Sequence, residues 1–96
     1  MRQREAEAWM RRCQVKLGLQ SWTLALEVVA AFDDVAQLGE CAFDDVHDKA
    51  ATVRVKRGMS YDQTRNVIAH EVAHVLLAEG DEYTCNRVAD LLTVGM

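Results

Sequence analysis

Hydrophobic residues recur along the chain with two different periods, and each change of period marks a predicted element. In residues 2–17 they fall three or four positions apart, which predicts an amphipathic helix. Alternating apolar and polar residues predict strands over 21–31 and 50–56. A third strand is predicted over 37–43, although Gly39 is unfavourable there.

The three predicted strands are separated by short connections. Because consecutive parallel strands need long crossovers, we expect a meander of antiparallel strands. The polar side of 50–56 carries Arg54 and Lys56, which is typical of an edge strand. The predicted sheet is therefore small and mostly antiparallel, with 50–56 at its edge.

Two further helices are predicted in the C-terminal half. Ser60 and Gln63 match the capping-box pattern, which predicts a helix over 61–79. Helical spacing of apolar residues predicts a last helix over 82–92. The expected fold class is α+β, and the length of the chain fits a single domain over 1–96.

Composition narrows the classes of function. The net charge of −4 argues against nucleic acid as the main partner, because phosphate binding needs a basic surface. No stretch reaches the length of a transmembrane helix, and the N-terminus lacks the apolar region of a secretion signal. The three cysteines are odd in number and far apart in the sequence, which favours reduced thiols. We therefore expect a cytoplasmic protein that binds neither nucleic acid nor membrane.

The strongest chemical signal is the run His70-Glu71-Val72-Ala73-His74, inside the predicted helix 61–79. Helical spacing places His70 and His74 one turn apart on one face, where two imidazoles can bind one Zn²⁺. Glu71 then lies to the side of the metal, where it can take a proton from an activated water. The chain has three histidines, and two of them flank this glutamate, which argues against coincidence.

This H-E-x-x-H pattern resembles the zincin signature of zinc metallopeptidases. The expected order of elements is similar to that of a minimal zincin-like domain, and SprT-like and small phage-type metallopeptidases look alike at this level. The stretch 82–92 also resembles the E-x-x-A-N-x-F-A-x-x-L-L stretch of ImmA/IrrE-type peptidases, with Cys85 where that pattern has Ala. The resemblance implies a peptide or protein substrate, bound as an added strand along 50–56.

A catalytic zinc usually has three protein ligands, so one more is expected after the motif. Glu82 followed by Asn86 resembles the Glu-x-x-x-Asp of gluzincins, which implies Glu82 as the third ligand. A simple helix hairpin turning at Gly80 instead places Asp90 level with the histidines. Both residues remain candidates for the third zinc ligand, with Glu82 preferred.

The motif and the resemblance predict a zinc-dependent metallopeptidase that hydrolyses peptide bonds with a metal-activated water and Glu71 as general base. Two other classes are a catalytically silent, zinc-stabilised binding or regulatory module and a small α+β interaction protein without metal. A structural zinc site usually has four protein ligands and needs no such base, which favours the peptidase. The side chains available to stabilise an oxyanion are Tyr61, Tyr83, Arg87 and His47, of which His47 otherwise reads as a polar turn residue.

Overall fold

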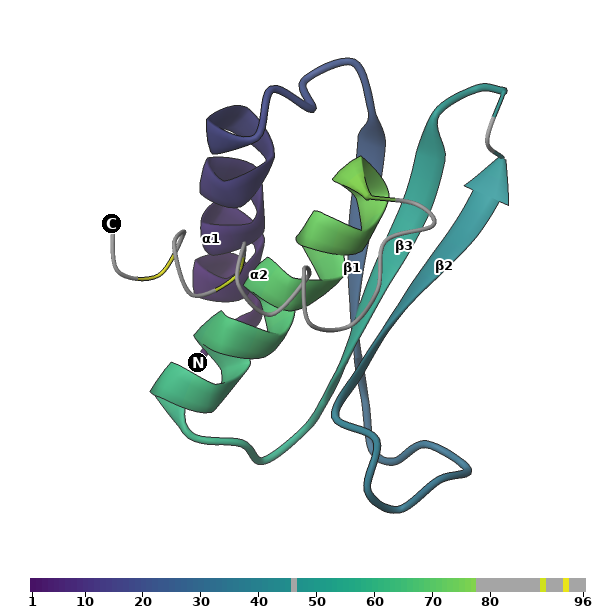
Figure 1. The fold of residues 1–96 in the computed structure, drawn as a ribbon. Helices are drawn as coiled ribbons and strands as arrows, with labels where there is room; N and C mark the ends of the chain where they lie inside the picture. The colour runs from purple at the N-terminus through teal and green to yellow at the C-terminus, as the bar shows by residue number, and fades with distance from the viewer. Residues whose placement is uncertain (46, 78–88, 90–92, 94–96) are drawn as a thin grey trace.

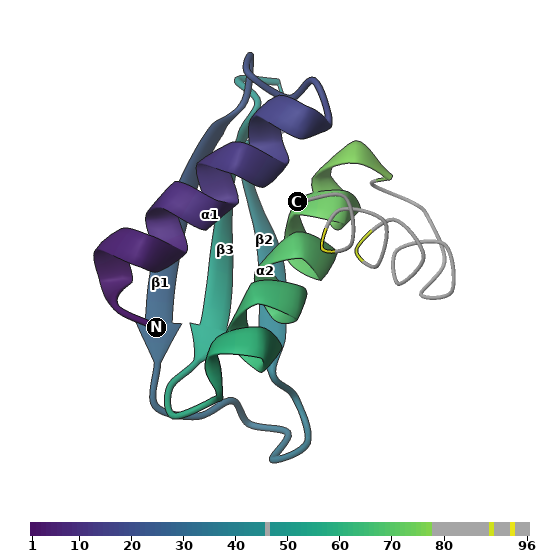
Figure 2. The same cartoon turned by 90° about the vertical axis from the view of Figure 1, so that its left-hand side faces the viewer.

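Two helices pack on the same face of a three-stranded sheet (Figure 1). The structure, a computed structural model, describes residues 1–45 and 47–77 together with Ala89 and Thr93. Viewed from the helical side, α1 and α2 both lie in front of the strands (Figure 2). The fold is therefore α+β, as expected. Its elements in chain order are α1 (Gln3–Lys16), β1 (Thr23–Val29), β2 (Gly39–Asp45), β3 (Ala50–Lys56) and α2 (Tyr61–Leu76).

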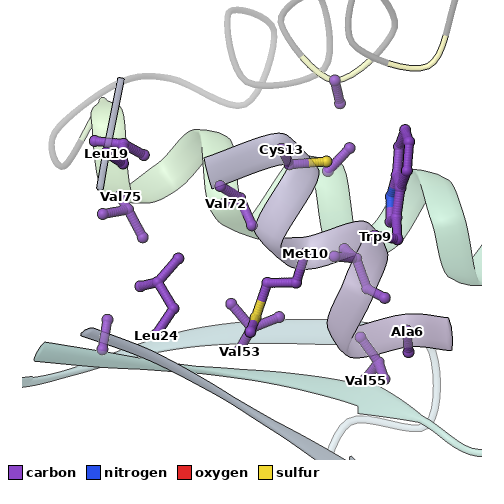
Figure 3. Close-up of a cluster of buried hydrophobic side chains, with 14 residues drawn as sticks. Ala6, Trp9, Met10, Cys13, Leu19, Leu24, Val53, Val55, Val72 and Val75 are labelled. Carbon is purple, nitrogen blue, oxygen red and sulfur yellow. The ribbon is translucent and has the colours of Figure 1, made fainter. Parts of the chain in front are cut away.

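Helix α1 forms where its apolar spacing predicts it. Its core-facing side chains are at most 5% exposed; they are Ala6, Trp9, Met10 and Cys13. Met10 extends from α1 toward Val53 of β3 (Figure 3). Beyond the helix, Gly18 has φ +71°, a conformation that costs glycine little and lets the chain turn toward β1.

Helix α2 begins at the predicted capping box. Ser60 Oγ accepts a hydrogen bond from the backbone N–H of Gln63, and Gln63 Oε1 accepts one from the backbone N–H of Ser60, both at 3.2 Å. These bonds satisfy donors that the first turn leaves free. Ile68, Val72 and Val75 are buried in the core, whereas Leu76 is 45% exposed.

Trp9 fixes α2 relative to α1. Its indole N–H donates to the backbone oxygen of Arg65 at 2.8 Å, which joins the two helices. The guanidinium of Arg65 lies 4.2 Å from the centre of the Trp9 ring, within cation–π range. Because α2 carries the histidine motif, this contact also helps to position the candidate site.

The sheet is mixed, and the predicted antiparallel meander is wrong. The strand order is β1-β3-β2, with β3 parallel to β1 and antiparallel to β2. No crossover helix is needed, because β2 itself returns the chain before β3 inserts beside β1. The prediction of 50–56 as an edge strand is wrong for the same reason. The central position suits β3, whose inward side chains are at most 1% exposed: Ala51, Val53 and Val55.

A row of charged residues crosses the sheet on the face away from the helices. Arg54 of β3 lies opposite Glu27 of β1 and Glu40 of β2 in the strand register. Its guanidinium contacts Glu27 at 2.6 Å and Glu40 at 3.0 Å, and these hydrogen bonds raise the pKa of Arg54. Exposed ion pairs add little stability, so we assign this row mainly to fixing the register of three strands.

The predicted helix over 82–92 lies outside the described residues, except at Ala89. Ala89 is helical and 4% exposed within the hydrophobic core. Its backbone oxygen accepts a hydrogen bond from Thr93 Oγ1 at 3.1 Å. In the part of the chain that the structure describes, neither helix combines the length and apolar content that crossing a bilayer requires.

Candidate metal centre

His70 and His74 lie one turn apart on α2 and bring their ring nitrogens together. The two Nε2 atoms are 3.0 Å apart, and the ring centroids are 4.7 Å apart with the planes at 74°. Two nitrogens bound to one zinc at tetrahedral geometry lie about 3.3 Å apart, given Zn–N bonds of about 2.0–2.1 Å. The two histidines are therefore as close as their spacing predicts, and their nitrogens are near the separation that one shared metal ion requires.

Glu71 completes the cluster. One of its carboxylate oxygens and a nitrogen of each histidine all lie within 4.8 Å of one another. Glu71 is 7% exposed, whereas both histidines are half-buried. Within the described residues, this is the one group of three metal-ligating side chains that close together. A cation held by the histidines would lie close enough to Glu71 for one water molecule to bridge them.

A cavity of about 460 Å³ opens beside these three side chains. That volume falls in the range of small-molecule and peptide side-chain sites. One wall comes from α2 and the other from the connection that enters β2. The lining residues are Gln37, Leu38, Gly39, Asn66, Val67, His70, Glu71 and His74. The chain, short as it is, therefore has room for a substrate group next to the histidines.

The position of the histidines along α2 also favours a cation. His74 lies in the last turn of the helix, and His70 lies one turn earlier. Because the carbonyl groups at a helix C-terminus carry partial negative charge, they stabilise positive charge nearby. The backbone thus adds a favourable electrostatic term to metal binding at His74.

Cys41 lies on the same face of β2 as the cavity but does not join the cluster. Burial, followed by the negative charges of Glu71, Asp44 and Glu40, raises the pKa of Cys41 to about 12. Burial likewise raises the pKa of Cys13 to about 12. Because alkylating reagents react with the thiolate, neither thiol is a ready nucleophile near neutral pH.

We expect Cys13 and Cys41 to resist iodoacetamide in the native protein at pH 8 and to react rapidly in guanidinium chloride. Their raised pKa values keep the thiols protonated until the fold opens. Mass-spectrometric peptide mapping after timed labelling measures each cysteine separately. Native labelling of Cys41 at the rate of a free thiol would contradict the assigned environment.

Some residues predicted for the site are not among the described residues, and two others lie away from the cavity. The preferred third ligand, Glu82, and its alternative, Asp90, lie outside the described residues, as do Tyr83 and Arg87. Tyr61 begins α2 and lies roughly 13 Å along the helix axis from His70 at a rise of about 1.5 Å per residue. His47 is exposed in the connection between β2 and β3, and neither His47 nor Tyr61 lines the cavity.

The cavity wall formed by Gln37, Leu38 and Gly39 was not predicted to belong to the site. Gln37 Nε2 donates to the backbone oxygen of Gly39 at 3.0 Å, which holds this segment together. The signal in the sequence was the glycine itself, since glycine inside a strand often marks a close approach of another segment. Gly39 lies under α2, close to the side chains of Glu71 and Val67.

The chain was compared with known proteins at three levels. A scan against protein-family models, a search of curated protein sequences and a search of solved structures returned no match. What the chain does must therefore be inferred from the geometry of the His70, Glu71 and His74 cluster.

Proposed function

We propose that this protein is a zinc-dependent metallopeptidase built on a minimal zincin-like domain. One observation carries the proposal: two histidine Nε2 atoms lie 3.0 Å apart beside a buried glutamate and an open cavity. His70 and His74 would hold the metal, with Glu82 as the proposed third ligand and Asp90 as the alternative. Glu71 is the proposed general base.

The chemistry divides between the metal and the side chains. When bound, zinc supplies Lewis-acid chemistry that acidifies water and polarises a carbonyl group. Glu71 would accept a proton from the attacking water at its carboxylate and deliver it to the leaving amine. Glu71 is 7% exposed and lines the cavity, so its carboxylate can meet a substrate or a water molecule that enters there.

The substrate would bind along β2 rather than β3. The β3 strand is paired on both sides, so it has no free edge for an added strand. Leu38 O accepts a hydrogen bond from Lys56 N at 2.9 Å, which makes these two residues a hydrogen-bonded pair. By antiparallel alternation, the backbone groups of Gly39, Cys41 and Phe43 point away from β3. That edge runs past the cavity and is suited to an extended peptide.

The opposite edge of the sheet is covered by side chains of α1. Gln3 Nε2 donates to the backbone oxygen of Leu26 at 3.2 Å, and an Arg11 nitrogen donates to that of Leu24 at 3.3 Å. These bonds occupy outward-facing carbonyls that would otherwise pair with another strand. On β2, Gln37 Nε2 likewise occupies the outward oxygen of Gly39, so an added strand would pair with the backbone groups of Cys41 and Phe43. We prefer β2 because its first residue lines the cavity beside the histidines.

The alternative is a catalytically silent module in which zinc stabilises a binding or regulatory domain. The closeness of the Glu71 carboxylate to both imidazoles favours it, because that carboxylate can then be a ligand rather than a base. The adjoining cavity argues for the peptidase, since a structural site needs no open volume beside it.

The test uses the zinc-loaded full chain and a mixture of synthetic peptides of varied sequence, with mass-spectrometric detection of cleavage. We expect cleavage that stops with 1,10-phenanthroline and returns when zinc is added. A protein that binds one zinc per chain but cleaves nothing in the mixture would support the silent module instead.

A further inference from the structure

Gly39 lies where the candidate base, Glu71, approaches the first residue of β2. It is the first residue of β2 and pairs with Val55 of β3, so its missing side chain would point inward beneath α2. Its φ is not positive, unlike that of Gly18 and Gly58, so the backbone alone does not require glycine here. The requirement must come from the neighbouring atoms.

Three groups occupy the space around position 39. A Cβ atom added there would overlap Cγ1 of Val67, and it would lie 2.9 Å from Oε2 of Glu71 and 3.3 Å from the backbone oxygen of Arg54. The Arg54 oxygen belongs to the central strand and cannot move away. The branched Val67 side chain has few alternative rotamers in a helix. Val67 is the nearest obstacle, and the Glu71 carboxylate, at the end of a flexible side chain, is the neighbouring group that can move away most easily.

We propose that Gly39 is a positioning residue for Glu71. Because Gly39 has no side chain, the Glu71 carboxylate can lie directly against the start of β2, within 4.8 Å of the ring nitrogens of His70 and His74. A methyl group at position 39 would crowd the Glu71 carboxylate from this side, and neither imidazole is among the three groups nearest to it. The catalytic consequence rests on the proposed peptidase function, whereas the effect on the carboxylate does not.

The experiment separates the two neighbours of position 39. Val67→Ala removes the bulkier obstacle, and Gly39→Ala/Val67→Ala then leaves the Glu71 carboxylate as the side chain in contact with the new methyl group. Ala42→Ser is the matched control, because position 42 alternates to the other face of the same strand. Each variant is measured for zinc affinity, kcat, KM and the carboxyl-carbon chemical shift of Glu71 in the metal-free protein.

Relative to Val67→Ala, we expect the double variant to keep its zinc affinity within about 2-fold and to change KM little. We expect kcat to fall about 10- to 100-fold, since misplacing a reacting group by about 1 Å can cost on the order of 100-fold. The Glu71 resonance should shift, and the Ala42→Ser protein should match wild type in every measurement. An unchanged resonance with unchanged kcat would overturn the proposal.

Two further outcomes remain decisive. If none of the proteins hydrolyses peptides, the proposed function fails, but the Glu71 resonance still tests the role of Gly39.

If Gly39→Ala/Val67→Ala folds poorly, the effect of Gly39→Ala on the free energy of unfolding is measured in two backgrounds. One background is Val67→Ala, and the other is Val67→Ala/Glu71→Ala. The loss of free energy of unfolding caused by Gly39→Ala should be smaller in the background that lacks the Glu71 carboxylate. An equal cost in both backgrounds would contradict a contact between positions 39 and 71.

Discussion

Glu71→Gln, loaded with zinc, is expected to hydrolyse peptides at least about 100-fold more slowly than wild type, the lower range for loss of a general base. Glutamine has nearly the same shape, so it should fit the same buried place against β2. Its amide cannot accept the proton from the attacking water. The measurement is kcat/KM for a cleaved peptide, at equal zinc occupancy of both proteins.

Zinc affinity of the same variant separates the two roles of Glu71. If Glu71 is the base, Glu71→Gln keeps the wild-type affinity, because the histidines and the third ligand are unchanged. If Glu71 is itself a ligand, the affinity falls along with any activity. Cleavage by Glu71→Gln at the wild-type rate would rule out the assigned mechanism.

His74→Ala is expected to abolish the stabilisation of the fold by zinc. For wild type, zinc at 100 times its dissociation constant should stabilise the native state by about 2.7 kcal/mol. For a domain of this size, that corresponds to a rise in Tm of roughly 10–20 °C. His74→Ala removes one of two nitrogens that lie 3.0 Å apart, so its Tm should respond little to added zinc.

His47→Ala is the matched control for that experiment, because His47 is exposed in the connection between β2 and β3 and does not line the cavity. Its Tm should rise with zinc as that of wild type does. The measurement is thermal unfolding followed by circular dichroism, with and without zinc. Equal zinc shifts in wild type and His74→Ala would show that the metal binds elsewhere.

Local structure was predictable wherever neighbouring residues decide it. The capping pair Ser60 and Gln63 placed the start of α2, and period-two alternation gave the bounds of β3. Strand order was not predictable by the same means, because it depends on contacts between distant segments. The inward face of β3 carries only Ala51 and two valines, and such a face is better buried at the centre of a sheet than at its edge.

The candidate site was likewise predictable only in the part that comes from one local segment. His70, Glu71 and His74 come from one helix, so their spacing in the sequence determines their proximity in space. The opposite wall comes from the connection into β2, whose distance from α2 depends on the strand order that the sequence did not reveal. Gly39 carried a signal nonetheless: it stands at an inward position of an alternating strand, where a side chain would normally pack.

The central claim is that His70 and His74 hold one zinc ion, and metal content tests it most directly. Protein purified without immobilised nickel is analysed by inductively coupled plasma mass spectrometry, for wild type and His70→Ala. We predict about one zinc per chain in wild type, as for a mononuclear site, and none in the variant. Wild-type protein that contains no zinc and takes none up, or a variant that retains it, would contradict the account.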